Sequence, residues 1–424
     1  MSPVKLLIVG AGCRGTEYAE YALTHPDRAI VVGVAEPREF YRKRLAEKHR
    51  IPEDRVFQDW RALAECGKCA DAVIIATPDQ EHVEPALLFS ELGYHMLLEK
   101  PMAVTAGDCR RIVDAAVEND IVFSVCHVLR YTRYTQTLKW MLDSGAVGDI
   151  VSVQHLEPVG YWHHAHSYVR GNWRNEQEST FMLLAKSCHD LDWLSYIIGN
   201  RCRHVSSFGA LKHFRPENRP QNAGDRCTQC AVETECPYSA LKIYMGRVKK
   251  GETGWPVDII TPIVTEESVL DALENGPYGR CVYACDNNVV DHQVVNLMFE
   301  EDVSAAFTMT AYTEAESRKT HIFGTRGHIY GDGSLIRHRD FLTDEVTEIN
   351  TSASDATILG GHGGGDYELM VNFIAAVQAK DKDMVLTGPG ESLESHLMVF
   401  AAEKARIENR IVAMDEYHSW EKRD

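Results

Sequence analysis

The sequence lacks a long hydrophobic run, and it lacks an excess of basic residues. No stretch of the 424 residues approaches the roughly 20 apolar residues that a membrane-spanning helix needs. With 44 basic against 62 acidic residues, the net charge is −18. This argues against nucleic acid and membrane as partners, because both reward basic patches. Residues 4–10 are typical of a strand and not of a secretion signal, so we expect a cytoplasmic protein.

The length of the chain indicates the number of domains, and its cysteine content indicates the state of the thiols. A chain of 424 residues is too long for one ordinary domain, so two domains are expected. Twelve cysteines should be reduced in the cytosol, which favours metal binding or simple burial over a disulfide framework.

A glycine motif follows the first predicted strand, residues 6–9. Gly10, Gly12 and Gly15 form G-x-G-x-x-G, with Cys13 and Arg14 between them, and residues 16–23 have helical spacing. This order of strand, glycine turn and helix is typical of a dinucleotide-binding site, with the phosphates at the helix N-terminus.

An acidic residue closes the second predicted strand, residues 29–35. Glu36 lies about 20 residues beyond the glycine motif. A carboxylate at this place accepts a hydrogen bond from the ribose 2′-hydroxyl of NAD and repels the 2′-phosphate of NADP. Glu36 therefore favours NAD, although Arg38 leaves NADP open.

Helices and strands continue to alternate as far as residue 127. Helices are predicted over 38–49, 61–65, 82–92 and 106–119, and strands over 72–76, 94–98 and 121–126. Such alternation predicts a parallel, doubly wound Rossmann domain over residues 1–127, with the strand ends lining one rim. Besides Gly10, Gly12, Cys13, Arg14, Gly15, Glu36 and Arg38, the predicted cofactor contacts on this rim are Thr77, Pro78, His82, Glu99, Lys100, Pro101 and His127.

The remaining residues, 128–424, predict an α/β substrate and oligomerisation domain. Strands are expected over 149–156, 290–299, 303–311, 320–323 and 327–330, in a large open sheet that is mainly antiparallel or mixed. Helices are expected over 366–377 and 390–409, and we expect them to return toward the first domain.

Four short motifs together resemble the glucose–fructose oxidoreductase, inositol dehydrogenase and rhizopine catabolism family (Gfo/Idh/MocA). They are the glycine motif at 10–15, Ala76-Thr77-Pro78, Glu99-Lys100-Pro101 and Ser144-Gly145-Ala146-Val147-Gly148. The resemblance covers essentially the whole chain. It implies an NAD(P)-dependent oxidoreductase acting on a sugar or cyclitol hydroxyl, and a homodimer or homotetramer formed through the second-domain sheet. It also implies that Lys100 reaches both nicotinamide and substrate.

A further motif of the family, D-x-x-x-H on a helix, is only half present. His189 matches the histidine, but Ala185 replaces the aspartate and Lys186 follows it. The catalytic residues we predict are therefore Lys100 as the positioning group, His189 as the base and Lys186 as a substitute for the missing polar side chain. If burial favours the uncharged amine, Lys100 could instead be the base itself. Lys186 could equally pair with Asp190 and take no part in the chemistry.

The segment from 127 to 174 is rich in aromatic and polar side chains, which suit the apolar faces and polar edges of a carbohydrate. A glycine-flanked histidine near residue 362 could close over a bound substrate. The predicted substrate contacts are Arg130, Tyr131, Trp162, His163, Arg174, Lys186, His189 and His362.

Cysteines cluster in a loop-like stretch further on. Cys227, Cys230 and Cys236, with Cys281 or Cys285 as a fourth ligand, predict a structural zinc site. An iron–sulfur cluster or unliganded thiols are the alternatives. Cys66 and Cys69 have no second pair nearby and are interpreted as bystanders.

Two other functions stay open at this point. One is a glycosidase or lyase that oxidises and re-reduces its sugar with bound NAD, so that no net redox change occurs. The other is a non-catalytic dinucleotide-binding sensor.

Overall fold

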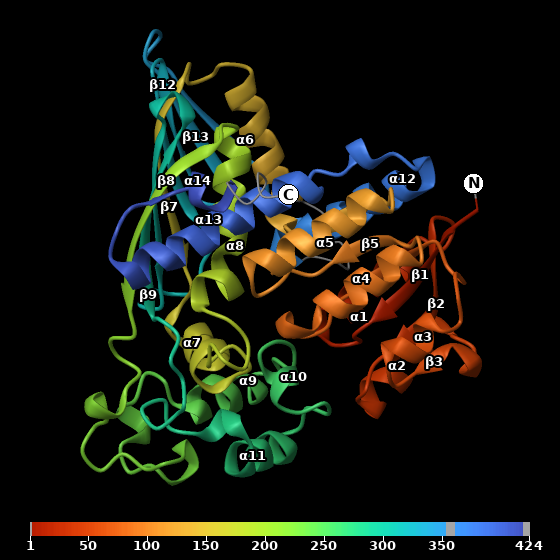
Figure 1. Cartoon of the computed structure of the whole chain (residues 1–424). Helices are drawn as coiled ribbons and strands as arrows, with labels where there is room; N and C mark the ends of the chain where they lie inside the picture. Colours follow the sequence, from red (N-terminus) through yellow and green to blue (C-terminus); the bar gives the residue numbers. More distant parts are fainter. Residues whose placement is uncertain (1, 353–360, 419–424) are drawn as a thin grey trace.

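The computed structural model describes residues 2–352 and 361–418 and contains two sheets with helices packed against them (Figure 1). The first sheet has six parallel strands in the order β3-β2-β1-β4-β5-β6. Its strands are β1 (Val4–Val9), β2 (Ala29–Ala35), β3 (Val56–Phe57), β4 (Ala72–Ile75), β5 (His95–Leu98) and β6 (Phe123–Val125). Its helices are α1 (Cys13–Thr24), α2 (Glu39–His49), α3 (Trp60–Ala64), α4 (Val83–Glu91) and α5 (Ala106–Glu118). The predicted Rossmann fold is confirmed.

Local sequence explains these elements. Strand β1 is nearly all apolar because helices cover both faces of a parallel sheet, and Leu6 is fully buried. Helix α5 begins after Thr105, whose hydroxyl accepts a hydrogen bond from the Asp108 amide at 3.1 Å. The helix buries an apolar face that includes Ile112 and Val113. The predicted boundaries of the first-half elements agree with the structure within a few residues.

The second sheet has nine strands in the order β14-β13-β12-β11-β7-β10-β9-β8-β15. They are β7 (Ile150–Pro158), β8 (Cys202–Ala210), β9 (His292–Phe299), β10 (Ser304–Thr310), β11 (Lys319–Gly324), β12 (Gly327–Gly331), β13 (Leu335–Asp340), β14 (Val346–Asn350) and β15 (Val412–Ala413). Strand β10 pairs parallel with β7 and antiparallel with β9, so the predicted mixed sheet is confirmed.

Helices cover one face of this second sheet. They are α6 (Arg133–Asp143), α8 (Met182–Ile198) and α13 (Pro389–Glu408). Helix α13 also packs against α5, and α12 (Gly365–Ala379) joins the core beneath β1. Both C-terminal helices therefore contact the first half of the chain (Figure 1). No helix of residues 2–352 and 361–418 is long and apolar enough to cross a membrane.

A subdomain of short helices is inserted between β8 and β9, and it forms the lower left of Figure 1. Its α-helices are α9 (Gly246–Val248), α10 (Val257–Ile260) and α11 (Glu266–Asn275), and it has its own apolar core. Single turns and short segments connect the rest: η3 (Val128–Tyr131), α7 (Tyr161–His164), η4 (Ala165–Arg170), η6 (Cys227–Gln229), η11 (Gly361–Gly364) and α14 (Asp415–His418).

Candidate active site

The glycine motif forms a tight turn where β1 meets α1. Gly10 has a φ of +91°, and a Cβ atom there would lie 2.4 Å from the Ala76 carbonyl oxygen. A Cβ at Gly15 would lie 1.9 Å from the Gly10 carbonyl oxygen. At Gly12, by contrast, a Cβ would meet only the Arg38 guanidinium, at 3.4 Å. Two glycines are therefore required by packing, and the third leaves the backbone open to a pyrophosphate.

Glu36 and Arg38 lie beside this loop. The Glu36 carboxylate is buried. It accepts hydrogen bonds from the Ala11 amide at 2.8 Å and from Arg38 Nε at 2.7 Å. Burial would raise the pKa of Glu36, but the hydrogen bonds from Arg38 outweigh it and hold the pKa below its usual value. The carboxylate is thus ionised at the place where a ribose hydroxyl would donate to it.

Arg14 ties the glycine loop to two other parts of the chain. Its Nε donates to Glu99 at 2.7 Å, and its Nη2 pairs with Asp366 in α12. Burial would raise the pKa of Glu99, but Arg14 and Lys100 lower it overall. Tyr18 donates to the same carboxylate at 2.7 Å. This network holds the backbone before Lys100 in place.

Lys100 crosses from the first sheet to the second half of the chain. Its ammonium donates to the Ala185 carbonyl oxygen in the first turn of α8, at 2.8 Å. His189 lies four residues later and so faces the same side of that helix. The structure thus brings Lys100 to the position where the family's aspartate would stand, next to the helix that carries His189.

Lys186 points to a different set of charges. Its ammonium lies 3.3 Å from Glu157 in β7, and Arg318 bridges Glu157 and Asp190 at 2.7 and 2.8 Å. Burial lowers the pKa of Lys186; Glu157 opposes this, and Arg318 and Lys100 reinforce it. The predicted Lys186–Asp190 pair does not form, because Asp190 is bound by Arg318 and His155.

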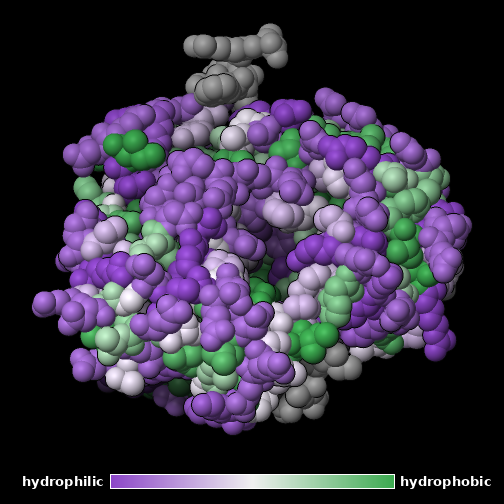
Figure 2. All heavy atoms as spheres, turned by 90° about the horizontal axis from the view of Figure 1, so that it is seen from below, coloured by the Kyte–Doolittle hydropathy of each residue, from purple (hydrophilic) through white to green (hydrophobic). Residues whose placement is uncertain are grey.

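An aromatic wall includes His163, the ring on which the charge of Lys186 acts. Trp162 and His163 in α7 contact Trp255 of the inserted subdomain, with ring centroids 5.2 and 4.9 Å apart. Burial, reinforced by Lys186, lowers the pKa of His163 well below its usual value, so the ring is neutral. Figure 2 views the molecule from below and shows a hollow near the middle of this face, surrounded mainly by hydrophilic residues.

Several predicted site residues have other partners. Arg130 is buried and paired with Asp192 at 2.7 Å, and the Tyr131 hydroxyl contacts Thr387 at 3.1 Å. Arg174 pairs with Asp286 at 2.9 Å. We therefore assign none of these three to the substrate, because their polar groups are engaged by protein partners.

The predicted rim histidines are internal. His82 is buried between the carbonyl oxygens of Thr77 and Pro101, at 3.0 and 2.8 Å, and so connects two strand ends. His127 is fully buried, and burial lowers its pKa to about 4. The His362 side chain lies outside the described residues.

The cysteines do not form a ready-made metal site. In the described part of the chain, no three His, Cys, Asp or Glu side chains are gathered closely enough to hold a metal ion. Cys227, Cys230, Cys236 and Cys281 nevertheless line one cavity, whereas the Cys285 thiol donates to the Cys281 carbonyl oxygen at 3.2 Å. The predicted zinc ion is thus without support from the geometry as it stands.

Two family models match the chain. One, an oxidoreductase family with an NAD-binding Rossmann fold, matches residues 4–127. The other, the C-terminal α/β domain of the same oxidoreductase family, matches residues 139–414. The chain belongs to the Gfo/Idh/MocA oxidoreductase family. The resemblance seen in the sequence motifs is confirmed, and membership supports an NAD(P)-dependent oxidoreductase.

Similar proteins include sugar-metabolising enzymes. The putative oxidoreductase YteT of Bacillus subtilis is 24% identical over 79% of each chain. The 2,7-anhydro-N-acetylneuraminate hydratase of Escherichia coli is 27% identical, over 49% of this chain and 54% of that relative. A structure of levoglucosan dehydrogenase in complex with NADH superposes with a TM-score of 0.71 at 17% identity, covering 97% of this chain and 99% of that one. That structural similarity shows the fold.

Two groups of site residues could not be found from the sequence. The Glu157–Arg318–Asp190 bridge joins β7, α8 and the turn before β11, and no spacing rule connects such distant positions. Trp255 lies in the inserted subdomain, where no motif marks it.

Proposed function

We propose that this protein oxidises or reduces a hydroxyl-bearing carbon of a sugar, cyclitol or sugar derivative, with NAD as the preferred dinucleotide. The observation that carries the proposal is the Lys100 ammonium, 2.8 Å from the Ala185 carbonyl oxygen of α8. It lies at the rim where the glycine loop would hold a dinucleotide. A sugar is favoured because the wall of Trp162, His163 and Trp255 offers apolar ring faces beside charged groups.

In the oxidative direction, the bound nicotinamide would accept a hydride from the carbon that carries the hydroxyl. Lys100 would donate to the reacting oxygen and stabilise its developing negative charge. His189 would accept the hydroxyl proton, and the hydroxyl becomes a carbonyl. Lys186, held by Glu157, would add positive potential on the side of His163.

The experiment is an assay of NADH formation over a panel of sugars and cyclitols with NAD⁺. Lys100→Met should lower kcat/KM at least about 100-fold and leave NAD⁺ affinity within a factor of about 3. Lys43→Met is the matched control, since Lys43 is an exposed lysine that pairs with Glu39 on the same helix. Equal turnover in both variants would contradict the proposed role of Lys100.

The redox-neutral alternative rests on one observation, the similarity to a hydratase. A reaction of this kind would consume the substrate without net NADH, while the family's dinucleotide chemistry stays the same. Product analysis by mass spectrometry separates the two: a product two hydrogens lighter than the substrate supports the dehydrogenase. Family membership together with named sugar enzymes favours either reaction over a non-catalytic sensor.

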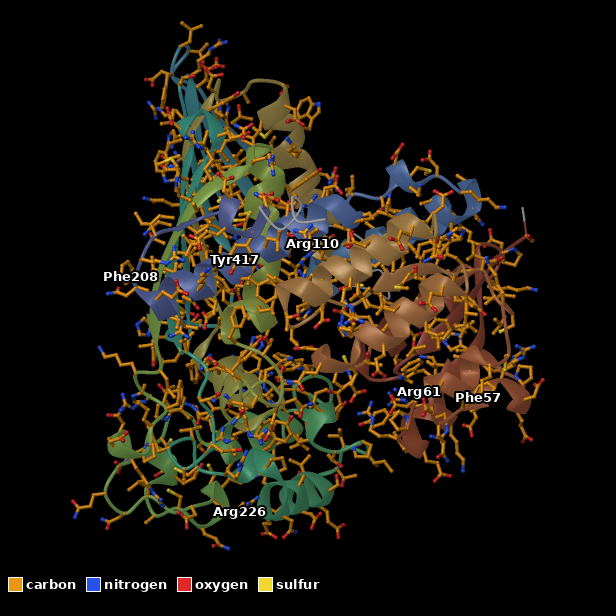
Figure 3. All side chains as sticks on the ribbon, in the orientation of Figure 1. Phe57, Arg61, Arg110, Phe208, Arg226 and Tyr417 are labelled. Carbon is orange, nitrogen blue, oxygen red and sulfur yellow. The ribbon has the colours of Figure 1, made fainter. Side chains whose placement is uncertain are left out.

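The second sheet offers a surface for self-association. Strand registers place Phe208, Met298 and Tyr330 on the face away from α6, α8 and α13, with exposures of 61%, 39% and 42%. Figure 3 shows Phe208 on the side of the sheet remote from the Rossmann half. A homodimer or homotetramer through this face would bury these side chains. Light scattering should give a multiple of 47.7 kDa, and Phe208→Glu should reduce it.

A further inference from the structure

Two buried carboxylates and two partly exposed cations form a cluster beside His189, on the second-sheet side of the site. Glu157 in β7 and Asp190 in α8 are the inner members, with side chains 3% and 0% exposed. Lys186 and Arg318, which contact these carboxylates, keep 17% and 18% of their side-chain surface exposed. A molecule that approaches from solvent therefore meets the nitrogen atoms of the cations before it meets the carboxylate oxygens.

The two cations have donors that the protein leaves unused. The Lys186 ammonium has three N–H groups, and among residues 2–352 and 361–418 its one ion-pair partner is Glu157, at 3.3 Å. Arg318 Nε contacts Glu157 at 2.7 Å and Asp190 at 2.8 Å, and its Nη2 reaches Asp190 at 3.5 Å. Arg318 Nη1 has no acceptor in those ranges. Free N–H groups of a lysine and an arginine at a partly exposed place are suited to an anionic ligand.

The surroundings of the cluster also favour an anion. Lys100 adds a third cation beside the first turn of α8, and its ammonium pairs with no carboxylate in the described part of the chain. The three cations therefore exceed the two carboxylates of the cluster by one positive charge. Burial lowers the pKa of Lys186, and Arg318 and Lys100 reinforce this although Glu157 opposes it. A bound anion would relieve the repulsion between these cations.

The place of the cluster assigns the anion to the substrate and not to the dinucleotide. The glycine loop after β1 is where the dinucleotide phosphates would lie, whereas Lys186 belongs to α8 and Arg318 to the turn before β11. Lys186 and His189 are three residues apart on one helix, so they share a face, with Cβ atoms roughly 5–6 Å apart. An anionic group at Lys186 and a reacting hydroxyl at His189 can therefore belong to the same monosaccharide.

We propose that the substrate carries a carboxylate, as a uronic acid does, and that Lys186 and Arg318 bind it. The inference rests on the proposed oxidoreductase function and narrows its substrate class. One carboxylate oxygen accepts from the Lys186 ammonium and the other from Arg318 Nη1, while Lys100 and His189 remain at the reacting hydroxyl. The single charge of a carboxylate matches the excess of one positive charge, whereas a phosphate ester carries about −1.5 to −2 at pH 7.

Matched sugars that differ at one carbon test the inference. One set is galactose, galacturonate and the phosphate ester of galactose at the same carbon, and the other is the corresponding glucose set. Calorimetry with protein saturated with NADH, which cannot oxidise an alcohol, measures binding, and NADH formation from NAD⁺ measures turnover. At least one of the two acids should bind at least about tenfold more tightly than its neutral sugar, and added salt should weaken the binding of that acid more than that of the neutral sugar.

Variants of the two cations show whether they carry the preference. Lys186→Met should reduce the preference for the acid over the neutral sugar at least about tenfold, through KM more than through kcat, whereas the control Lys43→Met should keep it. Arg318→Lys, which retains the charge and loses the planar guanidinium, should reduce it less than Arg318→Met. If Arg318→Met fails to fold because Glu157 and Asp190 lose their partner, the unmodified protein and Lys186→Met still decide.

The outcomes separate this inference from the function on which it rests. Failure of both acids to bind, equal binding of acids and neutral sugars, a preference for the phosphate esters, or an unchanged preference in Lys186→Met would overturn the inference. Turnover of neutral sugars in those cases would leave the proposed oxidoreductase function in place. Tight binding of an acid with no hydride transfer to NAD⁺ from any sugar of the two sets would instead count against the proposed function and support the carboxylate site.

Discussion

Arg130 was predicted to contact the substrate, but the structure pairs it with a buried carboxylate, so its replacement should affect stability. Its guanidinium donates through Nε and Nη2 to the two oxygens of Asp192, at 2.8 and 2.7 Å, and through Nη1 to the Leu386 carbonyl oxygen at 2.8 Å. Asp192 is fully buried. Arg130→Met therefore leaves a carboxylate in the interior, with the neutral His127 ring 3.8 Å away.

Removal of one partner of such a buried pair costs about 3–5 kcal/mol, a large part of a total stability of about 5–15 kcal/mol. The effect should depend on pH. Burial would raise the pKa of Asp192, but Arg130 lowers it overall, so the pair stabilises the fold above the unfolded-state pKa and loses this effect as pH falls through the folded-state pKa. The difference in unfolding free energy between wild type and Arg130→Met should be greatest near neutral pH and should narrow on acidification.

Urea unfolding followed by circular dichroism measures this difference. The double variant Arg130→Met/Asp192→Leu is the matched control, because it removes both charges and should recover much of the lost stability. A loss below about 1 kcal/mol at neutral pH, or a difference that widens on acidification, would show that the Arg130–Asp192 pair does not stabilise the fold in this way. A folded Arg130→Met protein with a raised KM and unchanged stability would support the substrate role instead.

Further predictions concern the cofactor loop and the buried histidines. Gly10→Ala should cost about 1–3 kcal/mol and abolish dinucleotide binding in calorimetry, whereas Gly107→Ala, where a Cβ meets nothing within 4 Å, should retain it. Glu36→Ala should raise the preference for NADP over NAD about tenfold or more in steady-state kinetics, because it removes a like charge from the 2′-phosphate. Burial lowers the pKa of His127 to about 4 and of His396 to about 3. In the unfolded chain these histidines take up protons below about pH 6.5, whereas in the folded protein they stay neutral to a lower pH. The free energy of unfolding should therefore fall by up to about 1.4 kcal/mol per pH unit for each histidine as pH drops from about 6.5 toward 4. His396→Asn should reduce that slope in thermal melts.

The first half of the fold was predictable because its rules are local. Apolar runs ending in Gly10 or Glu36 mark strands of a parallel sheet, and each helix follows at short range. The second sheet was predicted only in part. Its centre, β7 and β9–β12, has clear alternation, but β8, β13 and β14 carry many polar residues and gave no such pattern. Their pairing depends on neighbours far away in sequence.

The candidate site, too, was predictable where a local motif marks it and unpredictable where distant residues meet. Lys100 was identified from its motif, and the structure shows what the motif could not: the Ala185 backbone receives its ammonium. Lys186 was predicted to compensate for Ala185 or to pair with Asp190, yet its partner is Glu157, from another strand. The family's aspartate position alone could not predict this, because burial and charge balance across β7, α8 and β11 decide where the ammonium lies.

If Lys100 lies between a bound nicotinamide and a sugar hydroxyl, a hydride should pass directly from the sugar carbon to the dinucleotide, and isotope transfer measures this. A substrate from the sugar panel, deuterated at the carbon that reacts, would be incubated with the protein and NAD⁺, and the dinucleotide would be analysed by mass spectrometry. Deuterium should appear on the nicotinamide ring of NADH, and the rate of transfer should be at least about 100-fold lower in Lys100→Met. Substrate turnover without label on the nicotinamide, or full-rate transfer in Lys100→Met, would rule out this role of Lys100.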